Sequence, residues 1–125
     1  MKFHHIGIAC KDISEEIKSV SKIHDIIEIS PIVHDTEQDA KLCMVKTAEG
    51  VNIEFISGPQ VENLIKKRIS YYHMCFEVCD IEKEILRLQN TGAFLVSDVK
   101  PAILFNNKRV AFLSVSYGLI ELVES

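Results

Sequence analysis

Apolar residues along this chain follow two spacings, one typical of strands and one typical of helices. Dense stretches rich in Ile, Val and Phe, bounded by Gly, Pro, Asn or Asp, predict strands. Those strands are residues 3–9, 26–33, 40–46 and 51–57 in the first half, and 71–78, 93–99, 109–115 and 119–123 in the second. Helices are expected after Asp12, over residues 80–88 and, as a short connection, over 61–68, while 101–107 is expected to be a loop. This order predicts an α+β chain made of two βαβββ modules.

The two halves of the chain repeat each other. Residues 5–17 align with residues 73–85 at an offset of 68, and five of the thirteen positions are identical, among them His, Asp and Glu. Residues 53–56 match residues 120–123 at an offset of 67. Chance similarity between short apolar strings does not explain the shared polar residues. We therefore expect one domain over 1–125, with module one over about 1–58, a connecting helix over about 59–69 and module two over about 70–125.

Each predicted module places one His and one Glu on the strand face that its helix does not cover. Alternate side chains of a strand face opposite sides, so in the first strand His5 lies opposite Ile6. Glu54 likewise lies opposite the apolar residues of its strand, and His73 and Glu121 repeat this pattern in the second half. A pseudo-twofold between the modules would bring all four side chains together.

Two imidazoles and two carboxylates are a suitable ligand set for one divalent ion of Co, Ni, Mn, Zn or Fe, and the ligand types do not choose among these metals. The four candidate ligands are His5, Glu54, His73 and Glu121. A six-coordinate ion would keep two positions for a substrate with neighbouring oxygens. Taken singly, a His in a strand is more often a hydrogen-bonded core residue, and a Glu is more often solvated. Their repetition as a pair favours the metal.

Composition and charge exclude several classes of protein. Hydrophobic residues make up 47% and charged residues 26%, which is typical of a globular domain rather than a disordered chain. A formal charge of −4 without a Lys/Arg-rich face disfavours nucleic acid, and no apolar stretch approaches the length of a membrane span. Cysteines 10, 43, 75 and 79 lie in apolar runs without C-x-x-C spacing, so buried free thiols are expected. Reduced thiols and the lack of a signal-like N-terminus predict a cytoplasmic location.

Four strings resemble the vicinal oxygen chelate superfamily, which includes glyoxalase I, methylmalonyl-CoA epimerase, extradiol dioxygenases and antibiotic-binding resistance proteins. They are HHIGIA at residues 4–9, YHMCFEV at 72–78, KRVAFL at 108–113 and GLIELVE at 118–124. The chain is most similar to methylmalonyl-CoA epimerases, over nearly its whole length. One departure is that residues 101–107 stand where epimerases usually have a Gly-rich turn.

The resemblance implies two βαβββ modules in a pseudo-twofold repeat, forming a U-shaped mixed sheet around a metal site. His5, His73 and Glu121 fall on the first, third and fourth ligand positions of the family. Glu54 falls on the second, where some epimerases carry Gln and bacterial glyoxalase I carries Glu. Glu37, seventeen residues before Glu54, matches the proposed catalytic base of the epimerases, with Glu121 as a candidate second base.

The chain is therefore expected to be a metal-dependent isomerase or lyase. The first hypothesis is an epimerase that abstracts a proton α to the carbonyl of an acyl-CoA thioester. Glyoxalase I-like isomerisation of a glutathione hemithioacetal is the alternative, and a non-enzymatic small-molecule-binding module is the second alternative. Glu37 lies in an acidic, turn-like segment and is equally interpreted as a solvated loop residue. A homodimer is expected, with the ligands meeting within one chain or across the dimer.

Overall fold

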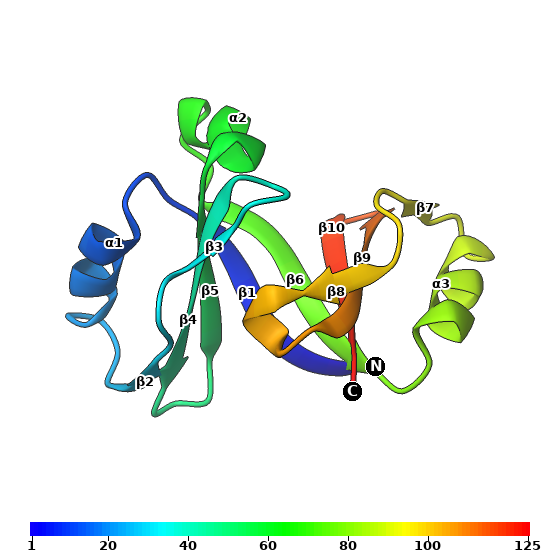
Figure 1. Cartoon of the computed structure of the whole chain (residues 1–125), viewed down its shortest axis with the longest axis horizontal. Helices are drawn as coiled ribbons and strands as arrows, with labels where there is room; N and C mark the ends of the chain where they lie inside the picture. The colour runs from blue at the N-terminus through cyan, green and yellow to red at the C-terminus, as the bar shows by residue number, and fades with distance from the viewer. The chain divides into compact units, whose positions relative to one another are not determined.

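The computed structural model describes all residues, 1–125. The chain divides into two compact units: the first unit is His5–Tyr72, and the second unit is His73–Ser125 together with Met1–His4. Each unit contains helices and strands (Figure 1), so the α+β class predicted from the sequence is confirmed. The domain boundaries expected from the repeat stay a prediction.

The first unit contains four sheet strands in a row and one more strand beside them. Its elements are β1 (Lys2–Ala9, from His5 onward), α1 (Ile13–Val20), β2 (Ile26–Ile29), β3 (Val33–Asp35), β4 (Ala40–Thr47), β5 (Asn52–Ser57), the 3₁₀ turn η1 (Pro59–Val61) and α2 (Glu62–Lys66). The strand order is β2-β4-β5-β1, and β3 also pairs with β4. β1 and β5 are parallel, whereas β4 is antiparallel to β2, β3 and β5.

The second unit repeats this connectivity strand for strand. Its elements are β6 (Tyr71–Val78, from His73 onward), α3 (Ile81–Gln89), β7 (Phe94–Leu95), β8 (Lys100–Ala102), the 3₁₀ turn η2 (Ile103–Phe105), β9 (Lys108–Val115) and β10 (Gly118–Glu124). The order is β6-β10-β9-β7, with β8 also paired to β9 and with β6 parallel to β10. The internal repeat of the sequence is thus consistent with the repeated arrangement of strands.

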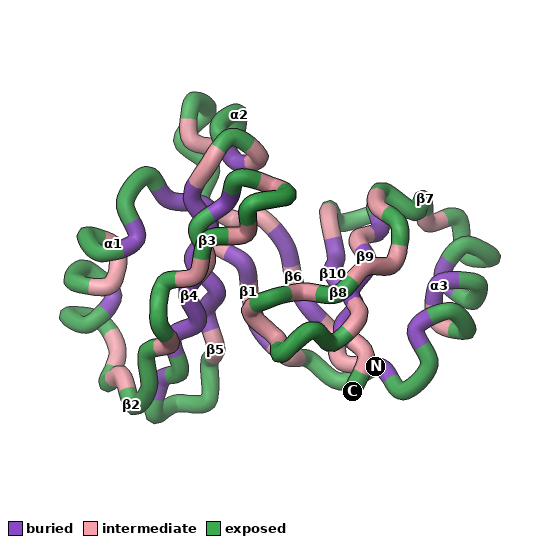
Figure 2. Tube along the Cα trace, in the orientation of Figure 1, coloured by how far each residue is buried: buried purple, intermediate pink, exposed green.

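One helix covers one sheet face in each unit. α1 follows Asp12 and α3 follows Asp80, and each aspartate caps its helix: Asp12 accepts from the Glu15 amide at 3.2 Å, and Asp80 accepts from the Lys83 amide at 3.1 Å. α1 packs Ile13 and Val20 onto a core of residues 43, 45, 53 and 55, and α3 packs residues 81, 85 and 88 onto residues 111, 113, 120 and 122. Figure 2 shows this burial along the strands and on one side of both helices. The opposite sheet faces are therefore left to the polar residues.

Two predicted strands are shorter in the structure than expected. The stretch 26–33 divides into β2 and β3, because Pro31 has no amide proton and interrupts the ladder after Ser30. The stretch 93–99 keeps only the two residues of β7. The expected loop 101–107 instead contains part of β8 and the turn η2, and ends at Asn106 and Asn107 with φ of 55° and 63°. Asparagine tolerates this left-handed conformation better than most residues.

The cysteines are free thiols, but one of them is not buried. Cys10, Cys43 and Cys75 are buried as expected, whereas Cys79 is exposed, so the prediction for Cys79 is wrong. Cys79 lies just beyond β6, between the strand and the N-cap Asp80, so the alternation of the strand does not bury its side chain. None of the helices is both long enough and apolar enough to cross a membrane.

Candidate functional site

In the first unit, His5 of β1 lies against Glu54 of β5. These strands are parallel with Gly7 opposite Glu54, so His5, two residues before Gly7, shares the sheet face of Glu54. The distance from His5 Nε2 to Glu54 Oε1 is 3.5 Å. The exposed fraction is 0% for His5 and 4% for Glu54, so this ionisable pair lies inside the protein. Burying such a pair carries a desolvation cost that a purely structural role does not require.

The second unit contains the same arrangement on its own parallel strands. Cys75 of β6 lies opposite Glu121 of β10, and His73 again precedes this position by two residues. His73 Nε2 lies 3.3 Å from Glu121 Oε1, with 1% of His73 and 4% of Glu121 exposed. The edge of the Phe112 ring packs at 87° against the His73 ring, with centroids 5.3 Å apart, and restricts its rotation.

Both pairs lie on the sheet face away from the helix of their unit. Glu54 alternates with Ile53 and Phe55, which pack beneath α1, and Glu121 alternates with the residues beneath α3. The structure thus brings the four candidate ligands together as two pairs, one in each unit. Their role as metal ligands stays a prediction.

The geometry of each pair fits two neighbouring ligands of a metal ion. Two donors at about 2.1 Å from one ion, at tetrahedral to octahedral angles, lie about 3.0 to 3.4 Å apart. The two Nε2–Oε1 separations, 3.5 and 3.3 Å, are close to that range. They are longer than the usual charge-assisted hydrogen bond of about 2.7 to 2.9 Å. Imidazole with carboxylate is also the donor set that Co, Ni, Mn, Zn and Fe accept.

Glu37, the candidate base, lies in the turn between β3 and β4 and is exposed. Its backbone amide donates to Asp35 Oδ1 at 3.1 Å, while its carboxylate forms neither a hydrogen bond nor an ion pair. The structure therefore fixes the backbone of this turn and leaves the carboxylate to solvent. Catalytic use of Glu37 stays a prediction.

Sequence reasoning missed a polar cavity in the first unit, on the α1 side of its sheet. Lys41 and Ser57 contribute to its wall. Each is a polar residue on the strand face that otherwise carries apolar residues beneath α1, and this break in the alternation is a signal that could have indicated the cavity.

Comparison with known proteins places the chain in a family. The model of the Glyoxalase/Bleomycin resistance protein/Dioxygenase superfamily matches residues 4–112, a range that includes His5, Glu54 and His73 and ends before Glu121. No curated protein matches the sequence significantly.

Several solved structures share the fold. Methylmalonyl-CoA epimerase from Mycobacterium tuberculosis is 20% identical, with 98% of this chain and 87% of that chain covered and a TM-score of 0.83. A Streptomyces coelicolor methylmalonyl-CoA epimerase in complex with 2-nitronate-propionyl-CoA is 20% identical, covering 100% and 94%, with a TM-score of 0.72. Glyoxalase I from Zea mays is 18% identical, covering 98% of this chain and 42% of that chain, with a TM-score of 0.67.

At these identities the structures establish a shared fold and leave the activity open. The family model, by contrast, matches most of the sequence itself, including the strings at residues 4–9 and 72–78. The chain therefore belongs to the glyoxalase/bleomycin resistance protein/dioxygenase superfamily, as those strings predicted.

Proposed function

We propose that this protein is a divalent-metal-dependent isomerase that removes and returns a proton on a carbon α to a carbonyl, as a methylmalonyl-CoA epimerase does. The observation that carries the proposal is the buried His/Glu pair present at the same place in both units. In this proposal His5, Glu54, His73 and Glu121 together hold one ion. Membership of a superfamily that contains such enzymes supports it.

A bound divalent ion supplies a Lewis acid that stabilises negative charge on the carbonyl oxygen as the α proton leaves. The chain contributes the surroundings of that step. Because all four candidate ligands are buried, water is largely excluded from them and electrostatic interactions there are strong. The low exposure also limits the number of side-chain conformations and so keeps the donors oriented.

Proton transfer is assigned to carboxylates of this chain. Glu37, whose carboxylate has no partner within the protein, takes the proton from one face of the substrate carbon. Glu121 is the candidate for returning a proton on the other face. An epimerase needs such access to both faces of the carbon. A proton that is returned to the face from which it was removed gives isotope exchange but no inversion of configuration.

An acyl-CoA thioester is the proposed substrate class. The Streptomyces coelicolor epimerase of the same fold is complexed with 2-nitronate-propionyl-CoA, a ligand of this class. The second candidate is a glyoxalase I activity on a glutathione hemithioacetal, favoured by Glu54 at the ligand position where bacterial glyoxalase I carries Glu. A non-enzymatic binding module is less favoured, because both buried pairs are complete. The homodimer and the cytoplasmic location stay predictions.

The test is exchange of the α proton. The chain is treated with EDTA, reloaded separately with Co, Ni, Mn, Zn and Fe, and mixed in D₂O with methylmalonyl-CoA and related acyl-CoA thioesters. Loss of the α-proton signal is followed by NMR, and methylglyoxal with glutathione is assayed in parallel. We expect metal-dependent exchange on a thioester; turnover of the hemithioacetal alone would support glyoxalase I instead. A chain inert to both with every metal contradicts both activities.

Glu37→Gln separates the base from a solvated loop residue. We expect this variant to keep its metal and to lose roughly 10²- to 10⁴-fold in exchange rate, as removal of a general base does. Glu49→Gln is the matched control, since Glu49 is also an exposed turn residue of the first unit, between β4 and β5. Equal rates in the two variants would exclude Glu37 as the base.

A further inference from the structure

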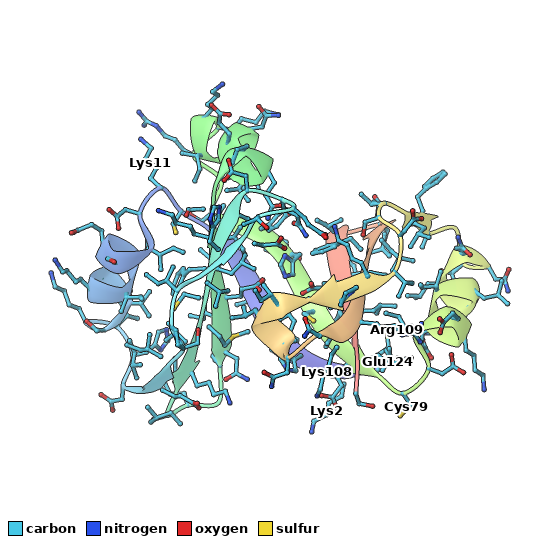
Figure 3. The ribbon with its side chains drawn as sticks, viewed as in Figure 1. Lys2, Lys11, Cys79, Lys108, Arg109 and Glu124 are labelled. Carbon is cyan, nitrogen blue, oxygen red and sulfur yellow. The ribbon has the colours of Figure 1, made fainter.

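The polar cavity of the first unit has a volume of about 410 Å³. Its polar lining comes from the β3–β5 strands and from the start of α1: His34, Lys41, Ser57, Lys11, Asp12 and Ser14. Figure 3 shows Lys11 on the segment that leads from β1 into α1. Cavities of this size accommodate small organic ligands as well as simple ions.

Three of these side chains form a row across three neighbouring strands. Lys41 of β4 lies opposite His34 of β3 on one side and opposite Ser57 of β5 on the other, so all three share one sheet face. Cys43, two residues after Lys41, packs beneath α1 and identifies this as the helix-covered face. Glu54 has the opposite alternation to Ser57. The cavity is therefore separate from the His5–Glu54 pair.

The charge of the lining is positive. Neither Lys11 nor Lys41 forms an ion pair within the protein. Asp12 is the one carboxylate in the lining, and its Oδ1 accepts from the Glu15 amide. His34 is paired through Nε2 with Asp39 Oδ1 at 2.9 Å. Two ammonium groups thus face one carboxylate that already serves as a helix cap.

Ser57 adds a hydrogen-bonding group to the cavity wall. Only 9% of this residue is exposed, but its hydroxyl makes no hydrogen bond within the protein and is open to the cavity. The hydroxyl is therefore available to a partner from outside the chain. The first backbone amides of α1, including that of Ser14, add donors and a favourable dipole for a negative charge.

We propose that this cavity binds a phosphate group, with Lys11 and Lys41 supplying charge and Ser57 and the α1 amides supplying hydrogen bonds. Phosphate suits the lining because its oxygens are acceptors only and can take up all of these donors at once. The site is distinct from the proposed metal centre and does not depend on it. Free phosphate and the nucleotide phosphates of a CoA derivative are two sources of the same chemistry, and the experiment distinguishes them.

The test is a titration of the ¹⁵N-labelled full chain, treated with EDTA so that phosphate binding to a metal does not contribute. Inorganic phosphate is added against chloride at constant ionic strength, and adenosine 3′,5′-bisphosphate is added in a second series. We expect saturable amide shifts centred on Ser14, Ser57 and Lys41. Tighter binding of the bisphosphate identifies a nucleotide as the source, and equal affinity identifies free phosphate.

Variants then assign the binding to this cavity. Lys41→Gln is expected to weaken phosphate binding roughly tenfold, the loss of about one charge-assisted hydrogen bond. Ser57→Ala should weaken it as well, with little change of shape. Lys46→Gln removes the same charge from the same strand outside the cavity and should change the affinity less than about twofold. Unshifted amides in the wild type, or equal affinities of Lys41→Gln and Lys46→Gln, would overturn the proposal.

Discussion

The four cysteines differ sharply in environment, although the sequence places all of them in apolar runs. Burial, followed by the nearby charges of Glu16 and Asp12, raises the pKa of the Cys10 thiol to about 12. Burial also raises the pKa of Cys43, against the partly compensating hydrogen bond from Ser30. A raised thiol pKa means less thiolate at a given pH, and thiolate is the reactive form. Cys10 and Cys43 are therefore protected by both access and protonation.

We predict that iodoacetamide at pH 8 alkylates one thiol of the native chain, Cys79, which is exposed just before α3 (Figure 3). Peptide mass spectrometry over time measures this, with all four thiols expected to react after unfolding in urea. Cys79→Ser should abolish the native reaction. Rapid modification of Cys10 in the native protein would show that its surroundings are more open than described.

For single residues, the sequence predicts the sheet face on which a side chain lies better than it predicts the contacts that the side chain makes. The face of His5 follows from the two-residue period of a strand once the strand is recognised. Its distance to Glu54 depends on the register of two parallel strands that are far apart in the chain, and only the folded structure supplies it. The predicted strand 71–78 has the same bounds as β6, so the wrong prediction for Cys79 came from extending burial to the residue after the strand.

Among the connections between elements, the turn after β5 is the most constrained. Gly58 has φ of +133°, and a Cβ built there would lie 2.6 Å from the carbonyl oxygen of Asp39 and 3.2 Å from Cα of Ala40. Both neighbours are backbone atoms and cannot move aside as a side chain would. The close approach is what allows the end of β5 to pass beside the start of β4.

We predict that Gly58→Ala lowers the free energy of unfolding by about 2 to 4 kcal/mol, through left-handed backbone strain and steric overlap. Gly50→Ala is the matched control: its φ is +89°, but nothing lies within 4 Å of the added Cβ, so about 1 kcal/mol is expected. Urea unfolding of both variants measures the difference. Equal losses would show that the Asp39 contact relaxes without cost.

The start of α3 is attached to its sheet by Arg109 of β9. The guanidinium bonds Glu82 of α3 and, at 2.9 Å, both carboxylate oxygens of Glu124 on β10 (Figure 3). Glu124 in turn accepts from the Ile81 amide at 3.0 Å and so caps the helix. The hydrogen bond from Arg109 holds the pKa of Glu82 below its usual range.

This arrangement predicts acid sensitivity at the start of α3. Because the folded chain holds the Glu82 pKa below its value in the unfolded chain, the pair stabilises the fold at neutral pH, and that contribution is lost as the pH falls through the lowered pKa. In Arg109→Gln, the Glu82 pKa should rise toward its ordinary value and the fall in Tm between pH 7 and pH 3 should become smaller. Carboxyl ¹³C titration and thermal unfolding check both. Lys83→Gln, on the same turn, should leave the Glu82 pKa and the fall in Tm nearly unchanged.

Helices and strands were predicted best where a sequence feature within a few residues marks them. Asp12 and Asp80 mark the two capped helices, because an N-cap acts within a few residues. β8 was not foreseen, since a strand of three residues beside a long partner is stabilised by that partner rather than by its own pattern. Pro31 lacks an amide proton and so predicts an interruption of the strand, but the apolar residues on both sides of it favoured a single continuous strand.

At the scale of the whole chain, the repeat gives each unit the same strand order and the same buried His/Glu pair. A unit of roughly sixty residues buries only a modest core of its own. A ligand bound by both units would therefore add stability to the entire chain rather than to one part. Two identical pairs also permit two metal-binding arrangements, one ion shared by four ligands or one ion on each pair.

Metal stoichiometry separates these arrangements. We predict one tightly bound divalent ion per chain after dialysis, measured by mass spectrometry of the metal, and close to none in either His5→Ala or His73→Ala. Independent pairs would instead give two ions in the wild type and leave one in each variant. His24→Ala, which removes an imidazole paired with Glu49 and distant in sequence from all four candidates, should keep the full ion.

At a metal concentration about 100 times the Kd, the wild type should gain roughly 2.7 kcal/mol of stability. That gain should vanish in both of the first two variants while their far-UV circular dichroism stays native, because removing one ligand from either unit destroys a shared site.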